Sequence, residues 1–291
     1  MKEIITWLAS VERLAHSLYR AASLFFGQDE AFSSFLEGLA LDELEHMDLI
    51  DRAAALLSED APALPSDIAL DPAATCQVTE PLEEALRLIG DRAITKEQMI
   101  DLIVAIEFSE LGDLFVYVLD ALAARNVAFQ RGAAEIQSHQ DRITRFLDTL
   151  PDVLRPTGGV QALPVVWERR YLVVDDDGPV RELLRRYLGK MGSVETAANG
   201  REGLEKLDGR FYDAVVTDVE MPGMDGIALF RQALARDPDV GGRFLFCSGY
   251  LSLDQQAFFL ENGLPHLEKP FRLAELERQV RMIVDRAGQR P

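Results

Sequence analysis

Five side chains that can do chemistry stand at or near the ends of strand-like runs in the C-terminal half of the chain: Asp175, Asp176, Asp218, Ser248 and Lys269. Carboxylates that lie together repel one another and favour a divalent cation, and oxygen ligands suit Mg²⁺. A carboxylate that attacks phosphorus also needs the charge on the phosphoryl oxygens neutralised. A cation, an ammonium group and a hydroxyl can do this. The set therefore predicts phosphoryl transfer to an aspartate beside Mg²⁺.

The strand-like runs must bring these side chains together. Each run is short, strand-like and followed by a helical stretch, at residues 171–174, 194–197, 214–217, 244–247 and 266–267. Alternating strands and helices predict a flavodoxin-like, doubly wound parallel sheet of five strands. In such a sheet the ligand site lies at the carboxyl ends of the strands, where the strand order reverses. We expect the five side chains to converge there.

Residues 170–291 resemble a CheY-like receiver domain of two-component response regulators, because these motifs follow one another in the family's order. The resemblance implies that Asp218 is the phosphoacceptor and also a ligand of Mg²⁺. It makes Asp175, Asp176 and the backbone carbonyl of Glu220 the other Mg²⁺ ligands. A receiver of this kind catalyses its own phosphoryl transfer and dephosphorylation.

The same resemblance covers three further residues. Lys269, which is followed by the family's proline, matches the phosphate-binding lysine, and Ser248 matches the switch hydroxyl. Three residues before the lysine the family usually has Tyr or Phe, whose ring turns inward on activation. This chain has His266, which would give a more polar and pH-sensitive switch surface. The simpler alternative is that the acidic residues only end strands and cap the helices that follow.

The N-terminal half reads as helical almost throughout. Four long periodic segments stand out, at residues 3–26, 30–58, 96–124 and 126–150. A long Pro- and Ala-rich connection with a short helix at 81–90 separates the two pairs. Two short links and one long crossover are typical of a ferritin-like four-helix bundle. We therefore expect this bundle at residues 1–150 and a Pro- and Gly-containing linker at 151–169.

Polar residues lie on the apolar seams of these predicted helices: Glu12, Glu43, His46, Glu110 and His139. Buried carboxylates are costly unless they are paired or bound to metal. The half resembles a rubrerythrin or ferritin-like domain, and the resemblance would make these five residues ligands of iron. Ile136 stands where the family's second Glu-x-x-His motif needs its glutamate. The missing carboxylate argues against a ferroxidase or peroxidase activity.

Two alternatives stay open for these seam residues. They can be paired with Arg13, Arg142 or tyrosine hydroxyls in a polar core, as most buried polar groups are paired within the protein. His139 also invites comparison with the phosphorylatable histidine of a kinase dimerisation helix. That role needs an exposed histidine, whereas the seam places His139 inward.

Composition restricts the partners and the compartment. The chain has a formal net charge of −19, and residues 1–150 carry 11 Lys and Arg against 27 Asp and Glu. Such an acidic half would be repelled by phosphate backbones, so we expect no direct contact with nucleic acid. Only two cysteines, Cys76 and Cys247, are present, and no run is apolar enough for a membrane span or signal peptide. We expect a cytoplasmic protein with no membrane contact.

These observations predict a response regulator that a sensor histidine kinase or a phosphotransfer protein phosphorylates on Asp218. The helical half would be an interaction, dimerisation or regulated module, and a homodimer through it is one form this could take. The alternative is a metal or redox sensor bundle of the di-iron type that is coupled to the receiver.

Overall fold

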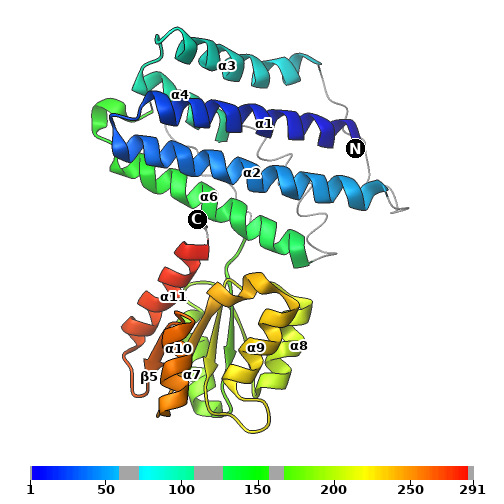
Figure 1. Ribbon diagram of the computed structural model, residues 1–291, viewed down its shortest axis with the longest axis vertical. Coiled ribbons are helices and arrows are strands. Elements are labelled where there is room, and N and C mark those ends of the chain that lie inside the picture. The colour runs from blue at the N-terminus through cyan, green and yellow to red at the C-terminus, as the bar shows by residue number, and fades with distance from the viewer. Residues whose placement is uncertain (1, 59–71, 108–126, 157–166, 288–291) are drawn as a thin grey trace. The chain divides into compact units, whose positions relative to one another are not determined.

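The computed structural model describes residues 2–58, 72–107, 127–156 and 167–287 (Figure 1). The chain divides into two compact units, Met1–Val166 and Trp167–Pro291. The predicted linker at 151–169 falls at this division, and its residues 157–166 lie outside the described part. In the described part, no helix has both the length and the apolar character that a membrane crossing requires.

The described residues of the N-terminal unit are helical. Its helices are α1 (Lys2–Phe25), α2 (Glu30–Ser58), α3 (Pro72–Gly90), α4 (Lys96–Glu107) and α6 (Val127–Thr149), followed by the short 3₁₀ helix η1 (Asp152–Leu154). Helices α1 and α2 lie side by side, α3 packs against α1, and α6 packs against α2 (Figure 1). The prediction of an all-helical half is confirmed for these residues, whereas its ferritin-like identity stays a hypothesis.

The apolar seams of α1 and α2 form the core of the helical unit. Leu18, Tyr19, Phe32 and Leu36 are fully buried and belong to one cluster. Helix α6 adds Phe146, whose ring stacks on Phe32 at 5.8 Å between centroids. A single helix of this length is only marginally stable in water. Burial of one apolar face per helix supplies most of the stability of the packed helices.

The prediction of a short helix at 81–90 is wrong in length. The structure continues this helix back to Pro72, so Pro81 lies inside α3. A proline in a helix interior removes one hydrogen bond, and the sequence pattern therefore favours a helix that starts there. In the structure, Val78, which precedes the proline, packs against the same core as Leu82 and Ala85, and this packing favours a helix that continues through Pro81. The predicted segment 96–124 is described only as far as Glu107.

The C-terminal unit is a five-stranded parallel sheet with the strand order β2-β1-β3-β4-β5, which confirms the predicted doubly wound architecture. Its strands are β1 (Arg170–Val174), β2 (Ser193–Ala197), β3 (Ala214–Asp218), β4 (Phe244–Ser248) and β5 (His266–Glu268). The order reverses between β1 and β3. The carboxyl ends of these two strands therefore frame the crevice in which such sheets bind ligands.

Helices cover both faces of this sheet. They are α7 (Gly178–Leu188), α8 (Gly200–Gly209), α9 (Gly226–Arg236), α10 (Leu253–Glu261) and α11 (Leu273–Ala287), with the 3₁₀ helix η2 (Pro238–Arg243) before β4. Because side chains alternate along a strand, Tyr171 and Val173 pack with α7 and α11, whereas Leu172 and Val174 pack in the core that includes α8, α9 and α10. Burial on both faces explains why the central strands β1, β3 and β4 read as nearly continuous apolar runs.

Candidate functional site

Three carboxylates meet where β1 and β3 end. One oxygen each of Asp175, Asp176 and Asp218 lies within 4.8 Å of the others. Asp175 is buried, Asp218 is half-buried and Asp176 is exposed. The sequence analysis placed these three residues together, and the structure does the same. Their oxygen-only donor set fits a hard divalent cation such as Mg²⁺.

Lys269 joins this cluster from the residue after β5. Its Nζ lies 2.9 Å from Oδ2 of Asp175 and 3.0 Å from Oδ2 of Asp218. These two bonds outweigh the effect of burial and raise the pKa of the lysine. Burial raises the pKa of Asp218, while the bond from Lys269 opposes part of that rise. The ammonium group thus supplies positive charge to both acids from within the protein.

Ser248 ends β4 next to the acidic cluster, and its side chain is buried. Its hydroxyl donates a hydrogen bond to the backbone carbonyl of Tyr250 and accepts one from the Tyr250 N–H at 3.2 Å. The backbone carbonyl of Ser248 accepts from the N–H of Lys269 at 2.7 Å. The Ser248 hydroxyl is therefore hydrogen-bonded to the loop that follows β4, and the Ser248 backbone is hydrogen-bonded to Lys269.

The turn after β3 approaches Asp218 very closely. A Cβ on Gly226 would lie 2.1 Å from the backbone oxygen of Asp218, so no other residue fits there without a backbone shift. Asp225 caps the helix that follows, by accepting a hydrogen bond from the Ala228 N–H at 2.7 Å. The backbone of Glu220 hydrogen-bonds to the Asp218 carboxylate and favours its charged form. The Mg²⁺ contact through the Glu220 carbonyl stays a prediction.

His266 opens β5 on the surface of the unit. Its ring is exposed and stacks on the ring of Phe259, with 5.1 Å between the centroids and 25° between the planes. Phe259 is fully buried in α10, so the histidine covers an apolar side chain at the edge of the core. The position is compatible with a switch residue, but that role also stays a prediction.

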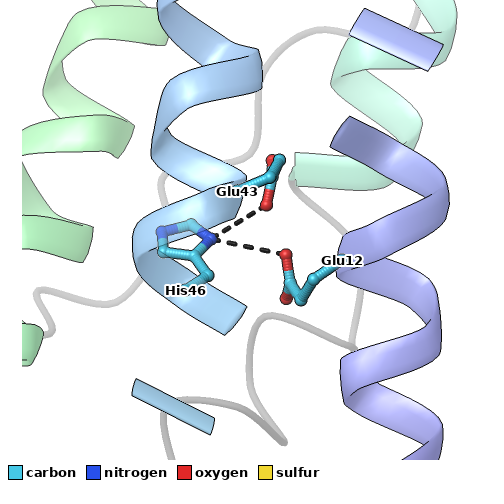
Figure 2. Close-up of side chains that lie close together, drawn as sticks. All are labelled: Glu12, Glu43 and His46. Carbon is cyan, nitrogen blue, oxygen red and sulfur yellow. Dashed lines mark hydrogen bonds and ion pairs between the residues drawn. The ribbon is translucent and has the colours of Figure 1, made fainter. Parts of the chain in front are cut away.

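A second cluster lies inside the helical unit, where α1 and α2 meet (Figure 2). His46 Nδ1 lies 3.0 Å from Oε2 of Glu43 and 3.4 Å from Oε2 of Glu12. Glu43 is almost fully buried, with 3% of its side chain exposed. The structure therefore brings together three of the five seam residues that the sequence analysis singled out.

His139 on α6 lies beside this cluster but has other partners. Its Nδ1 lies 2.7 Å from Oδ2 of Asp42, and its Nε2 lies 2.8 Å from Oε2 of Glu107. The two acids outweigh burial and raise the pKa of His139 to about 10. Arg142 forms an ion pair with Asp42 as well. Of the two arginines considered in the sequence analysis, Arg142 is thus placed in the polar network.

The sequence analysis missed Glu107 as a site residue and named Glu110, which lies outside the described residues. Glu107 also accepts a hydrogen bond of 2.6 Å from the buried hydroxyl of Tyr19. Its signal was its position four residues after Ile103, which is buried in the core.

A doubly wound parallel sheet with three carboxylates and a lysine at its carboxyl end is the arrangement that the sequence analysis expected of a receiver domain. Residues 171–281 match the family model of the response regulator receiver domain, and the C-terminal unit is therefore a receiver domain of that family. The family match ends within this unit. Receiver domains of response regulators typically use Mg²⁺ and exchange phosphoryl groups with histidine kinases or phosphotransfer proteins.

Known response regulators are similar over this part. The response regulator MprA of Mycolicibacterium vanbaalenii is 41% identical over 119 residues, which are 40% of this chain and 51% of MprA. The transcriptional regulatory protein PrrA of Mycobacterium tuberculosis is 40% identical over 121 residues, or 41% of this chain and 51% of PrrA. The chain thus spans about half the length of the curated relatives it matches.

Solved receiver structures also align with this chain. A CheY-like receiver domain from Methanospirillum hungatei is 28% identical, with a TM-score of 0.39, 42% of this chain covered and 98% of that one. The response regulator protein TrrA from Thermotoga maritima, solved with Mg²⁺ and BeF, is 31% identical, with a TM-score of 0.36, 40% of this chain covered and 98% of that one.

Proposed function

We propose that this protein is a response regulator of a two-component system whose receiver takes a phosphoryl group on Asp218 from a histidine kinase or a phosphotransfer protein. The observation that carries the proposal is the placement of Lys269, which bonds to Asp175 and Asp218 at the point where the strand order reverses. One acid is thereby presented as the nucleophile, with a second acid and a cation beside it.

The residues of this chain have distinct tasks in that reaction. An oxygen of Asp218 forms the new bond to phosphorus, while the bond from phosphorus to the donor breaks and the donor leaves with its electron pair. Asp175, Asp176, Asp218 and the Glu220 carbonyl would hold Mg²⁺, which supplies positive charge to the phosphoryl oxygens. Lys269 exchanges its bond to Asp218 for one to the new phosphoryl group.

Ser248 would report the reaction to the rest of the unit. Its hydroxyl now donates to the Tyr250 carbonyl. A phosphoryl oxygen on Asp218 is a stronger, charged acceptor. The hydroxyl would turn toward it and release the loop between β4 and α10, on which Tyr250 is exposed, and Leu253 at the start of α10 is exposed as well. His266 lies beside α10, the helix that follows this loop, through its stack on Phe259.

The reaction can be tested on the full chain with acetyl phosphate and Mg²⁺. We expect an acid-labile phosphoryl group on the protein by intact mass and none in Asp218→Asn. Asp208→Asn is the matched control, because this exposed aspartate in α8 forms an ion pair with Arg236 outside the site. Equal labelling of Asp218→Asn, or no labelling of the natural chain by acetyl phosphate or by a kinase, would contradict the proposal.

We infer that the helical unit is the part of the protein through which phosphorylation acts on partners, with self-association as one form. The support is the two-unit division of the chain and the receiver's place in the C-terminal unit. Sedimentation velocity with and without beryllofluoride, on the natural chain and on Asp218→Asn, tests the dimer. Self-association that is the same in all four samples would argue against it.

The alternative, an iron-dependent redox sensor coupled to the receiver, is not favoured by the comparisons. The family match covers residues 171–281 and concerns the receiver. A cytoplasmic location is consistent with the relatives and stays part of the proposal. PrrA is named as a transcriptional regulatory protein. In this chain, the acidic helical half makes contact with nucleic acid unfavourable.

A further inference from the structure

The helical unit holds a group of metal-ligating side chains that the receiver chemistry does not use. Glu12 comes from α1, Glu43 and His46 from α2, Glu107 from α4 and His139 from α6. Two sets of three contain donor atoms that all lie within 4.8 Å of one another, namely Glu12, Glu43 and His46, and Glu43, Glu107 and His139. The two sets share Glu43, so the positions they define are adjacent.

In the second set, the negative charge of the carboxylates is already neutralised by a side chain of the protein, His139. Both ring nitrogens of His139 face carboxylates, Asp42 at 2.7 Å and Glu107 at 2.8 Å. An imidazole that bonds to acids through both nitrogens carries two protons, and a ring in that state has no lone pair for a metal. His139 therefore acts as the buried cation of this set. Glu107 is further satisfied by the Tyr19 hydroxyl.

The first set is arranged differently. A single nitrogen, Nδ1 of His46, faces both Glu12 and Glu43, and all three side chains point toward the same place (Figure 2). Glu43 is almost fully buried, with 3% of its side chain exposed, and His46 is nearly as buried, with 10% exposed. A cation at the place where these side chains converge would have three donors, namely two carboxylate oxygens and one ring nitrogen.

We propose that Glu12, Glu43 and His46 bind one divalent transition-metal cation inside the helical unit, with His139 as a counter-ion and not a ligand. Two carboxylate oxygens and one imidazole nitrogen suit a first-row divalent cation better than Mg²⁺, which prefers oxygen ligands and keeps several waters. A cation bound there would replace any protons on these side chains, because ligating carboxylates and imidazoles must be deprotonated. The site is independent of the receiver and does not rest on phosphorylation of Asp218.

The geometry also assigns a role to the surrounding residues. Asp42, which also pairs with Arg142, bonds to Nδ1 of His139, and the rings of His46 and His139 meet edge to face at 5.1 Å between centroids. His139 thereby fixes the orientation of the His46 ring without touching the cation. Partners of this kind position a ligating histidine.

The test uses the full chain, freed of metal with a chelator and titrated with Co²⁺ in the presence of excess Mg²⁺. We expect one Co²⁺ per chain by calorimetry, with visible ligand-field absorption that shows nitrogen ligation, and a rise in the melting temperature of the helical unit. Glu43→Gln should lose all three responses. Because it mimics the protonated side chain, it should keep the metal-free fold, which circular dichroism can check.

Four variants distinguish this site from the other acidic and histidine side chains that could take up Co²⁺. Glu37→Gln, on an exposed turn of the same helix, and His16→Gln, whose ring bonds to the Ala40 carbonyl, should bind Co²⁺ as the natural chain does. Asp175→Asn removes the acidic pair of the receiver and should also leave the response unchanged. Folded His139→Gln should still bind one Co²⁺.

Three outcomes would overturn the proposal. The first is no Co²⁺ response in the natural chain, and the second is an equal response in Glu43→Gln. The third is two Co²⁺ per chain with both lost in folded His139→Gln, because His139 would then be a ligand.

Discussion

Nζ of Lys269 lies 3.0 Å from Oδ2 of Asp218, although the two residues are 51 positions apart in the chain. They belong to the ends of different strands, and only the parallel sheet brings them together. The lysine occupies the place that positive charge must take when the aspartate carries a phosphoryl group. The Lys269 ammonium therefore reduces the repulsion between Asp175 and Asp218 in this site.

Replacing Lys269 with Gln should strengthen Mg²⁺ binding and slow phosphoryl transfer. The ammonium competes with the metal for Asp175 and Asp218, and its removal leaves two facing carboxylates with no counter-charge. We expect Mg²⁺ affinity to rise on the order of tenfold, equivalent to about 1.4 kcal/mol, by calorimetry. Labelling by acetyl phosphate should fall. Lys190→Gln, an exposed lysine of the same unit, should change neither quantity.

Replacing Gly226 with Ala should destabilise the receiver and disturb the turn beside Asp218. The new Cβ would meet a backbone oxygen at 2.1 Å, and backbone cannot move aside as a flexible side chain can. We expect a loss of about 1–3 kcal/mol in the free energy of unfolding. Gly209→Ala is the control, because no atom lies within 4 Å of its Cβ. Equal effects of the two changes would contradict this account.

Asp213 should hold the first strand of the receiver in place. Its Oδ2 accepts hydrogen bonds from Nε1 of Trp167 at 2.9 Å and from the N–H of Arg170 at 2.8 Å. Asp213→Ala removes the acceptor of both hydrogen bonds and should cost about 1–3 kcal/mol. Asp213→Asn keeps an oxygen for both and should cost less. Urea unfolding of a Trp7→Phe background, with Trp167 as the reporter, measures the difference.

The same residue gives a pH dependence with a definite sign. Burial raises the pKa of Asp213 above its ordinary value of 3.8, so the folded protein takes up the proton first as the pH falls. The stability linked to that proton is fully present below 3.8 and is lost as the pH rises through the folded value. Natural receiver should therefore gain stability relative to Asp213→Asn as the pH is lowered. A constant difference between about pH 7 and about pH 4 would show that the acid is not shifted.

Phe32 should be a main determinant of helical-unit stability. It is fully buried, stacks on Phe146, and lies under the Lys96 ammonium at 4.7 Å. Phe32→Ala should cost about 3–5 kcal/mol because it leaves a cavity in the core. Leu24→Ala, at a side chain that is 80% exposed, should cost far less. Trp7 fluorescence in a Trp167→Phe background follows this unit alone.

The sequence by itself determined the receiver almost completely. Short apolar runs alternate with helices, and parallel sheets place the ends of such strands at one edge. Each predicted strand agrees with the observed strand to within one residue at either end. Asp175, Asp176, Asp218 and Lys269 were therefore expected together, and they lie together.

The tertiary structure decided what local patterns leave open. Pro81 reads as a helix start, yet α3 runs through it, and Val78 on the preceding turn packs against the core. His139 reads as a metal ligand, yet its two nitrogens face Asp42 and Glu107 from two other helices. Helical periodicity indicates which residues turn inward. Which inward residues meet, and whether they share protons or a cation, depends on helix packing across long sequence separations, which spacing alone does not determine.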